Sequence, residues 1–129
     1  INKNGSINLT ENKNNIVLYM KQQSRRKKAQ YLQNWIRKKL LKTFKHLKKS
    51  DVHVAKTGEH GIDIKLSRIG KRLVPYQIEA KNTERFKTIY NFYKQGQKYG
   101  DLNTVLIVKQ NTYKPLVIID ADHFFDLIK

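Results

Sequence analysis

Asp63, Glu79 and Lys81 have the side chains and the spacing to bind a hard cation beside a phosphate. Asp63 lies in a segment that alternates apolar and polar residues, and Glu79 and Lys81 lie two residues apart in another. Side chains two positions apart in a strand project from one face of a sheet. Carboxylates are ligands for Mg²⁺, and a neighbouring ammonium group stabilises charge that develops during phosphodiester hydrolysis or helps to orient the attacking water. We therefore predict a catalytic site here, with Mg²⁺ (or Mn²⁺ in its place) bound by the two acids and the Ala80 carbonyl.

Two adjacent strands must position these residues. We predict strands over residues 61–67 and 73–81, joined by a turn over residues 68–72 in which Gly70 takes a positive φ. In that register the two acids are diagonal neighbours, which lie about 7–8 Å apart at the backbone. Two carboxylates can share one cation across that gap. A slip of one residue would turn one acid to the opposite face of the sheet.

The other elements are predicted from the period of their apolar residues. From Ser24 onward these recur at three- and four-residue steps, which predicts a long amphipathic helix with Ser24 as its N-cap. Its apolar stripe consists of Ala29, Leu32, Ile36, Leu40, Phe44 and Leu47. Further expected elements are a strand over residues 51–55, a helix over 83–99 that Thr83 caps and Gly100 ends, a buried strand over 104–108, a strand over 116–119 and a helix over 120–127.

The order of these elements predicts one α/β (α+β) domain over residues 23–129, preceded by an N-terminal extension or arm over residues 1–22. The sequence has no cysteine, which excludes disulfides and thiolate zinc sites. No apolar run approaches the roughly 20 residues that span a bilayer. The start of the chain lacks the apolar centre of a signal peptide. We therefore expect no membrane association and a cytoplasmic protein.

The charge of the chain is strongly positive. Lys and Arg number 27 against 10 Asp and Glu, for a net charge of +17, and only Glu11 is acidic among the first fifty residues. Such an uneven excess favours a polyanionic partner, most commonly nucleic acid, and predicts salt-dependent binding. The residues expected to contact DNA are Arg25, Arg26, Lys27, Lys28, Arg37, Lys38, Lys65, Arg68, Lys71 and Arg72.

The order of acid, hairpin, Glu-x-Lys and flanking helices resembles the PD-(D/E)xK nuclease superfamily. That resemblance implies a restriction-endonuclease-like αβββαβ core, in which a mixed central sheet is flanked by helices. It covers the chain from Ser24 to the C-terminus, and Ile62 stands where the superfamily pattern has a proline. The segments that resemble small phage-encoded members, related to resolvase-like and recombination nucleases, are Leu32-Gln33-Asn34-Trp35, Gly58 to Asp63, Glu79-Ala80-Lys81-Asn82 and Lys114-Pro115-Leu116-Val117.

The resemblance implies a magnesium-dependent endonuclease acting on duplex or branched DNA in a bacterial or phage-infected cell. The implied endonuclease is homing- or restriction-like, or it resolves Holliday junctions. Gln95 and Tyr99 resemble the QxxxY element of recombination-type relatives, which implies a catalytic role for Gln95, with Gln97 as an alternative. Gln33 or Gln30 stands where some relatives have a glutamate. A palindromic or branched substrate needs two sites, so a homodimer or higher homo-oligomer is expected. The alternative is a non-catalytic nucleic-acid-binding protein that uses its basic helix.

Overall fold

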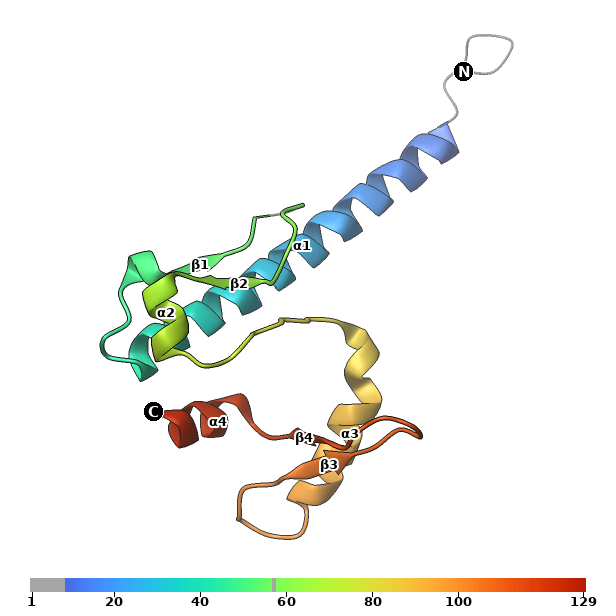
Figure 1. Cartoon of the computed structure of the whole chain (residues 1–129). Helices are drawn as coiled ribbons and strands as arrows, with labels where there is room; N and C mark the ends of the chain where they lie inside the picture. Colours follow the sequence, from blue (N-terminus) through green and yellow to red (C-terminus); the bar gives the residue numbers. More distant parts are fainter. Residues whose placement is uncertain (1–8, 57) are drawn as a thin grey trace.

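The longest element is α1 (Leu9–Thr43), a helix of 35 residues whose C-terminal half packs on other elements while its N-terminal half projects away from them (Figure 1). The computed structural model describes residues 9–56 and 58–129. The elements that follow are η1 (Lys49–Asp51), β1 (Val52–Val54), β2 (Ile64–Leu66), α2 (Arg68–Leu73), η2 (Glu84–Phe86), α3 (Lys87–Gln97), β3 (Leu106–Val108), β4 (Leu116–Ile118) and α4 (Ala121–Ile128).

The strands form two separate antiparallel pairs. In the first sheet β1 pairs with β2, so that Val52 lies opposite Leu66. In the second sheet β3 pairs with β4, so that Leu106 lies opposite Ile118. The chain is therefore an α+β protein, as expected. In the described residues, however, two two-stranded sheets stand in place of the single mixed central sheet that the resemblance implied.

The core lies between the C-terminal half of α1, the first sheet and α4. Leu40 and Val52 are fully buried, with 0% of the surface of each residue accessible to solvent. The Trp35 and Phe125 rings meet edge to face at 6.1 Å between centroids, which packs α4 on α1. The buried apolar residues are Ile36, Leu40, Leu47, Val52, Ile64, Val74 and Phe125. The apolar stripe predicted for the long helix is thus confirmed at Ile36 and Leu40, whereas Leu47 is buried in the segment after α1, which ends at Thr43.

The long helix begins earlier than the sequence predicted. Ser24 lies inside α1 and is not its N-cap, because the helix already begins at Leu9. Neither glycine nor proline occurs between Leu9 and Thr43, so nothing interrupts the helix there. Residues 9–22 of the predicted N-terminal extension or arm are therefore helical, and residues 1–8 lie outside the described part. The side chains from Ile16 to Met20 are exposed on the projecting half.

The predicted hairpin between residues 61 and 81 does not form. A short helix, α2, replaces the turn, because the Ser67 hydroxyl caps it by accepting a hydrogen bond of 2.9 Å from Gly70 N. Gly70 is buried in this helix, whereas the sequence predicted a positive φ there. Residues 74–83 have no regular hydrogen-bonded structure, so the third strand is missing. Pro75 explains part of this result, since proline cannot donate to a ladder.

The predictions for the C-terminal half are mostly confirmed. Thr83 caps η2 by accepting a hydrogen bond from Arg85 N, and α3 follows and ends shortly before Gly100, whose φ is +153°. Asp120 caps α4 by accepting a bond of 3.0 Å from His123 N. A strand forms within the predicted range 104–108, as β3, but the prediction that it is buried is wrong, because 66% of Ile107 is exposed. No helix in residues 9–56 and 58–129 has the length and apolar character needed to cross a membrane.

Candidate active site

Asp63 lies next to the Glu-x-Lys triplet, as the predicted site requires. It directly precedes β2, and its main-chain oxygen accepts a hydrogen bond of 2.9 Å from Ala55 N, which continues the pairing of β1 with β2. Its Oδ2 accepts a second bond of 2.8 Å, from the backbone N–H of Ala80. Both the backbone and the half-buried side chain of Asp63 are thus fixed, and the carboxylate faces the peptide group that joins Glu79 to Ala80.

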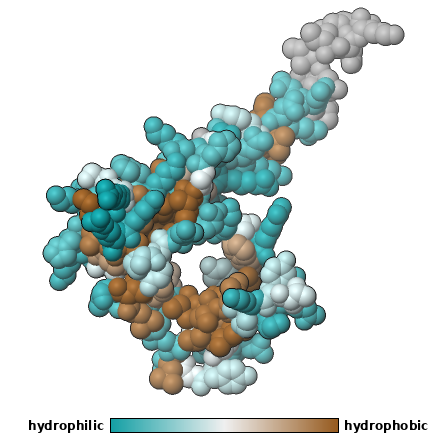
Figure 2. All heavy atoms as spheres, in the orientation of Figure 1, coloured by the Kyte–Doolittle hydropathy of each residue, from teal (hydrophilic) through white to brown (hydrophobic). Residues whose placement is uncertain are grey.

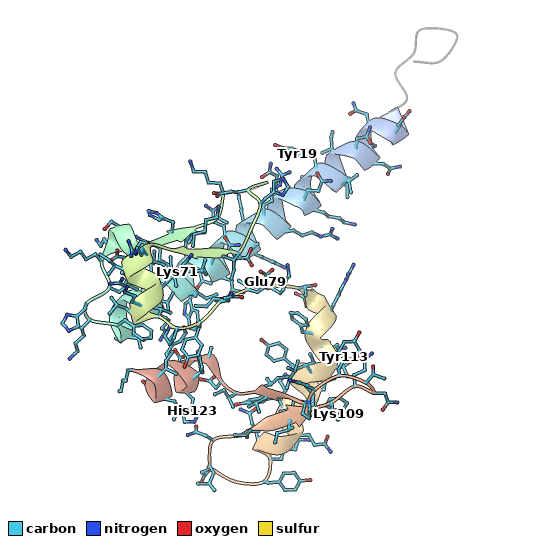
Figure 3. All side chains as sticks on the ribbon, viewed as in Figure 1. Tyr19, Lys71, Glu79, Lys109, Tyr113 and His123 are labelled. Carbon is cyan, nitrogen blue, oxygen red and sulfur yellow. The ribbon has the colours of Figure 1, made fainter. Side chains whose placement is uncertain are left out.

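Glu79 and Lys81 form an ion pair beside that hydrogen bond. Lys81 Nζ lies 2.9 Å from Glu79 Oε1, so the two side chains share one side of the extended segment, as their spacing predicted. Figure 3 shows Glu79 on this segment, which passes between α1 and α3. The hydrogen bond and the charge of Glu79 raise the pKa of Lys81, and the charge of Asp63 raises it further. Both acids therefore stabilise the protonated form of Lys81.

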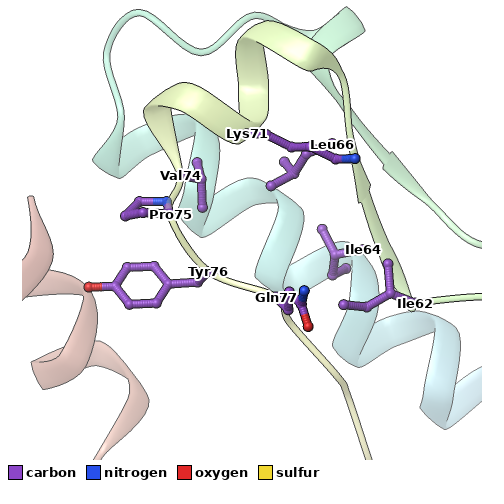
Figure 4. Close-up of a pocket in the computed structure, with 8 residues that line it drawn as sticks. All are labelled: Ile62, Ile64, Leu66, Lys71, Val74, Pro75, Tyr76 and Gln77. Atoms are coloured by element: carbon purple, nitrogen blue, oxygen red, sulfur yellow. The ribbon is translucent and has the colours of Figure 1, made fainter.

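The segment after α2 runs beside β2 without pairing with it. A cavity of about 290 Å³ lies between them. Figure 4 shows Ile62 and Ile64 on one side of this cavity, with Val74, Pro75 and Gln77 facing them from the other. The two segments that the sequence predicted to be adjacent are therefore adjacent. A single side chain-to-backbone bond at Asp63 joins their far ends, in place of the expected ladder of backbone bonds.

A second cavity opens between Asp63 and α1. It has a volume of about 250 Å³, and Gln30 and Gln33 line it together with Arg26, Glu59 and Asp63. The two glutamines that stand where some relatives have a glutamate thus face the first acid of the site. Their amides add polar groups to the cavity without adding charge.

Glu59, which the sequence places only in the loop before the strand, is also held at this cavity. It accepts a hydrogen bond of 2.7 Å from Lys56 N and forms an ion pair with Lys65. The hydrogen bond from Lys65 is the main reason that the pKa of Glu59 lies below its usual value, and the bond from Lys56 N lowers it further. The signal in the sequence is an acid four residues before Asp63 in a chain that has few acids.

The donor atoms at Asp63 and Glu79 fit a hard divalent cation. Within residues 9–56 and 58–129 no group of three or more His, Cys, Asp or Glu side chains comes together. Mg²⁺ does not need one, since it commonly binds one or two carboxylates and keeps waters and phosphate oxygens as its other ligands. Asp63, Glu79 and the carbonyl of Ala80 are the groups that would hold it. Each carboxylate has a second oxygen besides the one bonded to Ala80 or Lys81.

The basic residues predicted to contact DNA separate into two kinds. Arg37 and Lys65 are half-buried and bonded within the protein, since Arg37 donates to Val52 O and Lys49 O at 2.9 Å and Lys65 pairs with Glu59. Lys28 is exposed, and its Nζ lies 3.8 Å from Glu84. The other predicted residues are exposed on α1 (Arg25, Arg26, Lys27, Lys38) and on α2 (Arg68, Lys71, Arg72).

Gln95 is exposed on α3 and lines neither of the two cavities that Lys81 borders. Tyr99, the other residue of the resembling element, is 86% exposed beyond the end of that helix. In one of these cavities the residues of α3 that lie beside Lys81 are Lys87, Tyr90, Asn91 and Lys94, none of which was predicted as a site residue. The catalytic role of Gln95 stays a prediction.

Comparison of the chain with protein-family models, with curated proteins and with solved structures finds no match. A function for this site therefore has to be argued from the chemistry and the positions of its residues.

Proposed function

We propose that this chain is a magnesium-dependent DNA endonuclease of the PD-(D/E)xK type, with Mn²⁺ able to replace Mg²⁺. The observation that carries the proposal is the bond of 2.8 Å between Asp63 Oδ2 and Ala80 N. It brings an acid and a Glu-x-Lys triplet together from two segments of the chain, and this is the arrangement that the chemistry requires. The αβββαβ core belongs to the same proposal, with residues 74–81 in the place of its third strand.

Each group of the site has a distinct task in this reaction. Asp63, Glu79 and the Ala80 carbonyl would hold the cation, which when bound polarises the phosphate and acidifies a water. Lys81 carries its positive charge at neutral pH as any exposed lysine does, and Glu79 and Asp63 raise its pKa further. With 67% of its side chain exposed, Lys81 can reach an incoming phosphate and stabilise the charge that grows on it during cleavage.

The substrate in this proposal is duplex or branched DNA. The net charge of +17 favours a polyanion, and exposed basic side chains on α1 and α2 are available to neutralise phosphates. Such contacts position the DNA and do not read its sequence. Cleavage of both strands of a palindrome, or of a junction, calls for two sites, which a homodimer supplies. The cytoplasm of a bacterial or phage-infected cell belongs to the proposal as the place of action.

The test is cleavage of supercoiled plasmid with Mg²⁺ and with EDTA. We expect nicked or linear product only with Mg²⁺, and none from Asp63→Ala or Lys81→Ala. The control is Lys109→Ala, which removes an exposed lysine from the loop between β3 and β4, far from Glu79 in Figure 3. Equal cleavage by all four proteins would exclude the assignment. A panel of junction, nicked and linear substrates then separates a junction-resolving enzyme from a homing- or restriction-like one.

The second candidate is a non-catalytic nucleic-acid-binding protein. One observation favours it: both acids already have partners within the chain, Asp63 in Ala80 N–H and Glu79 in Lys81. In that case binding to DNA falls steeply with salt, is the same with Mg²⁺ and with EDTA, and is not followed by cleavage. The plasmid assay therefore distinguishes the two candidates directly.

A further inference from the structure

Two cavities lie side by side next to Lys81 and share a wall. One has a volume of about 370 Å³ and the other about 430 Å³, and Lys81, Phe86 and Tyr90 line both. Both volumes fall within the range of about 300–1,000 Å³ that is typical of ligand pockets. The wall therefore separates two pockets of suitable size, which differ in chemistry.

The smaller cavity is basic. Lys87, Asn91 and Lys94 line it from α3, where positions i, i+4 and i+7 share one face of the helix, and Lys81 lines it from the preceding segment. Its one acid, Glu84, pairs with Lys28 of α1 at 3.8 Å. The ammonium groups of Lys87 and Lys94, that of Lys81, which also pairs with Glu79, and the amide of Asn91 form a set of donors that matches the oxygens of a phosphate.

The larger cavity is apolar and aromatic. Ile89 and Tyr93 of α3 face Ile118 and Ile119 across it. Asp120 also borders this cavity, but its carboxylate caps α4 by accepting from His123 N. In Figure 2 apolar side chains gather over β3 and β4 along the edge of a central hollow. A flat group with an aromatic face fits such a lining, and a nucleobase is such a group.

We propose that one nucleotide of an unpaired strand binds across the wall formed by Phe86 and Tyr90. Its phosphate lies in the basic cavity and its base in the aromatic one. The base of an intact duplex is paired and stacked and cannot enter, so the favoured substrate has an unpaired or splayed segment. The inference rests on the proposed function in one respect: the strand held here leads to Lys81, which borders both cavities. It narrows the substrate from DNA in general to branched or partly unpaired DNA.

The first test is fluorescence anisotropy in EDTA with the full chain, fluorescein-labelled oligothymidylate and a blunt duplex of equal length. Tyr90 is 62% exposed, so its replacement should leave the fold intact. We expect Tyr90→Ala to weaken binding of the single strand about 5- to 150-fold, as for loss of one stacked base, and duplex binding by less than about twofold. Tyr90→Phe keeps the ring and should bind like wild type. Tyr99→Ala, the matched control outside both cavities, should do the same.

The second test concerns the phosphate. Lys87→Ala with Lys94→Ala should make the dependence of log affinity on log salt shallower by about 1.4 for the single strand, the value for two lost phosphate contacts. The control pair is Lys109→Ala with Lys114→Ala, exposed lysines in the loop between β3 and β4, which should change the slope little. An oligouridylate of equal length shows whether the strand is taken as DNA or RNA, and binding of RNA alone would overturn the inference.

The inference is overturned if Tyr90→Ala binds the single strand like wild type, if it loses single strand and duplex equally, or if the two lysine pairs have equal effects. Its failure is distinguishable from failure of the proposed function. Binding is measured in EDTA, so a protein that cuts no plasmid can still show the Tyr90 effect. Conversely, loss of the Tyr90 effect leaves metal-dependent cleavage by Asp63 and Lys81 unaffected.

Discussion

The backbone N–H of Ala80 donates a hydrogen bond to Asp63 Oδ2, and this contact joins two parts of the chain 17 residues apart. An asparagine at position 63 can accept the same bond but carries no charge. The structural and the catalytic contributions of Asp63 can therefore be separated by choosing the substitution.

We expect Asp63→Asn to unfold in urea at the same concentration as wild type and to lose Mg²⁺-dependent plasmid cleavage. Asp63→Ala should lose cleavage too, together with about 1 kcal/mol of stability, because the Ala80 N–H loses its partner. The measurements are urea denaturation followed by circular dichroism, and the initial rate of nicking. Wild-type cleavage by Asp63→Asn would show that the charge is not needed.

Lys81 should act as a cation and not as a base. Its folded pKa is raised above the ordinary 10.5, so its positive charge is fully present below that value and is lost only as the pH rises through the raised pKa. Lys81→Arg keeps the charge at every pH, and we expect it to retain much of the activity, with the pH profile of wild type below 10.5. Lys81→Gln should lose about 100- to 1,000-fold in rate. Equal loss in both variants would instead indicate a base.

The sequence predicted what depends on local signals and missed what depends on contacts between distant segments. The cap at Thr83 and the apolar stripe around Leu40 follow from local side-chain chemistry and helical period, and both are confirmed. The third strand was wrong because alternation alone does not distinguish a paired strand from an extended segment, and Pro75 was a warning against it.

The candidate site was predictable in its residues but not in its support. Asp63 meets the triplet through Ala80 N and not through a sheet ladder, because α2 takes up the residues that would have formed the turn. The structural role of Arg37 could not be predicted either, since a sequence shows its charge but not the two carbonyls to which it donates. The cavity of Lys87 and Lys94 depends on how α3 lies against Lys81, which no local pattern specifies.

Gly70→Ala should destabilise the protein. A Cβ at Gly70 would lie 2.8 Å from the backbone oxygen of Asp51. That oxygen cannot easily move away, because it accepts a hydrogen bond from Ser67 N. Overpacking costs about 1–3 kcal/mol, whereas the better helix propensity of alanine returns at most about 1 kcal/mol. The check is thermal unfolding beside Ile69→Ala, a change at an exposed neighbour expected to stay within about 0.5 kcal/mol. Equal melting temperatures for the two variants would contradict the close contact.

Asp51 should make the first sheet sensitive to acid. The Ser67 hydroxyl and then Lys48 N donate to its carboxylate, at 2.7 and 2.9 Å, and these bonds lower its pKa below the ordinary 3.8. A lowered folded pKa gives stability that is present above the ordinary value and is lost as the pH falls through the lowered one. Near neutral pH the melting temperature of wild type should therefore be higher than that of Asp51→Asn. The difference between the two melting temperatures should close below pH 3.8. Asp101→Asn, at an exposed acid, is the control and should follow wild type throughout; a gap that persists in acid would contradict the assignment.

Arg37 should support the fold and contribute little to DNA binding, although the sequence placed it among the DNA contacts. Its guanidinium joins α1 to the start of β1 by donating to Val52 O and Lys49 O, each at 2.9 Å. Arg37→Ala should cost about 2 kcal/mol or more of stability and leave the salt dependence of DNA binding unchanged. Arg26→Ala, at an exposed position beside Asp63, should leave stability unchanged and make the dependence of log affinity on log salt shallower by about 0.9.

Arg37→Lys separates charge from geometry, because a lysine keeps the charge but cannot bridge both carbonyls. This variant should therefore also be less stable than wild type. An Arg37→Ala protein with wild-type stability and a shallower slope would return this residue to the DNA interface.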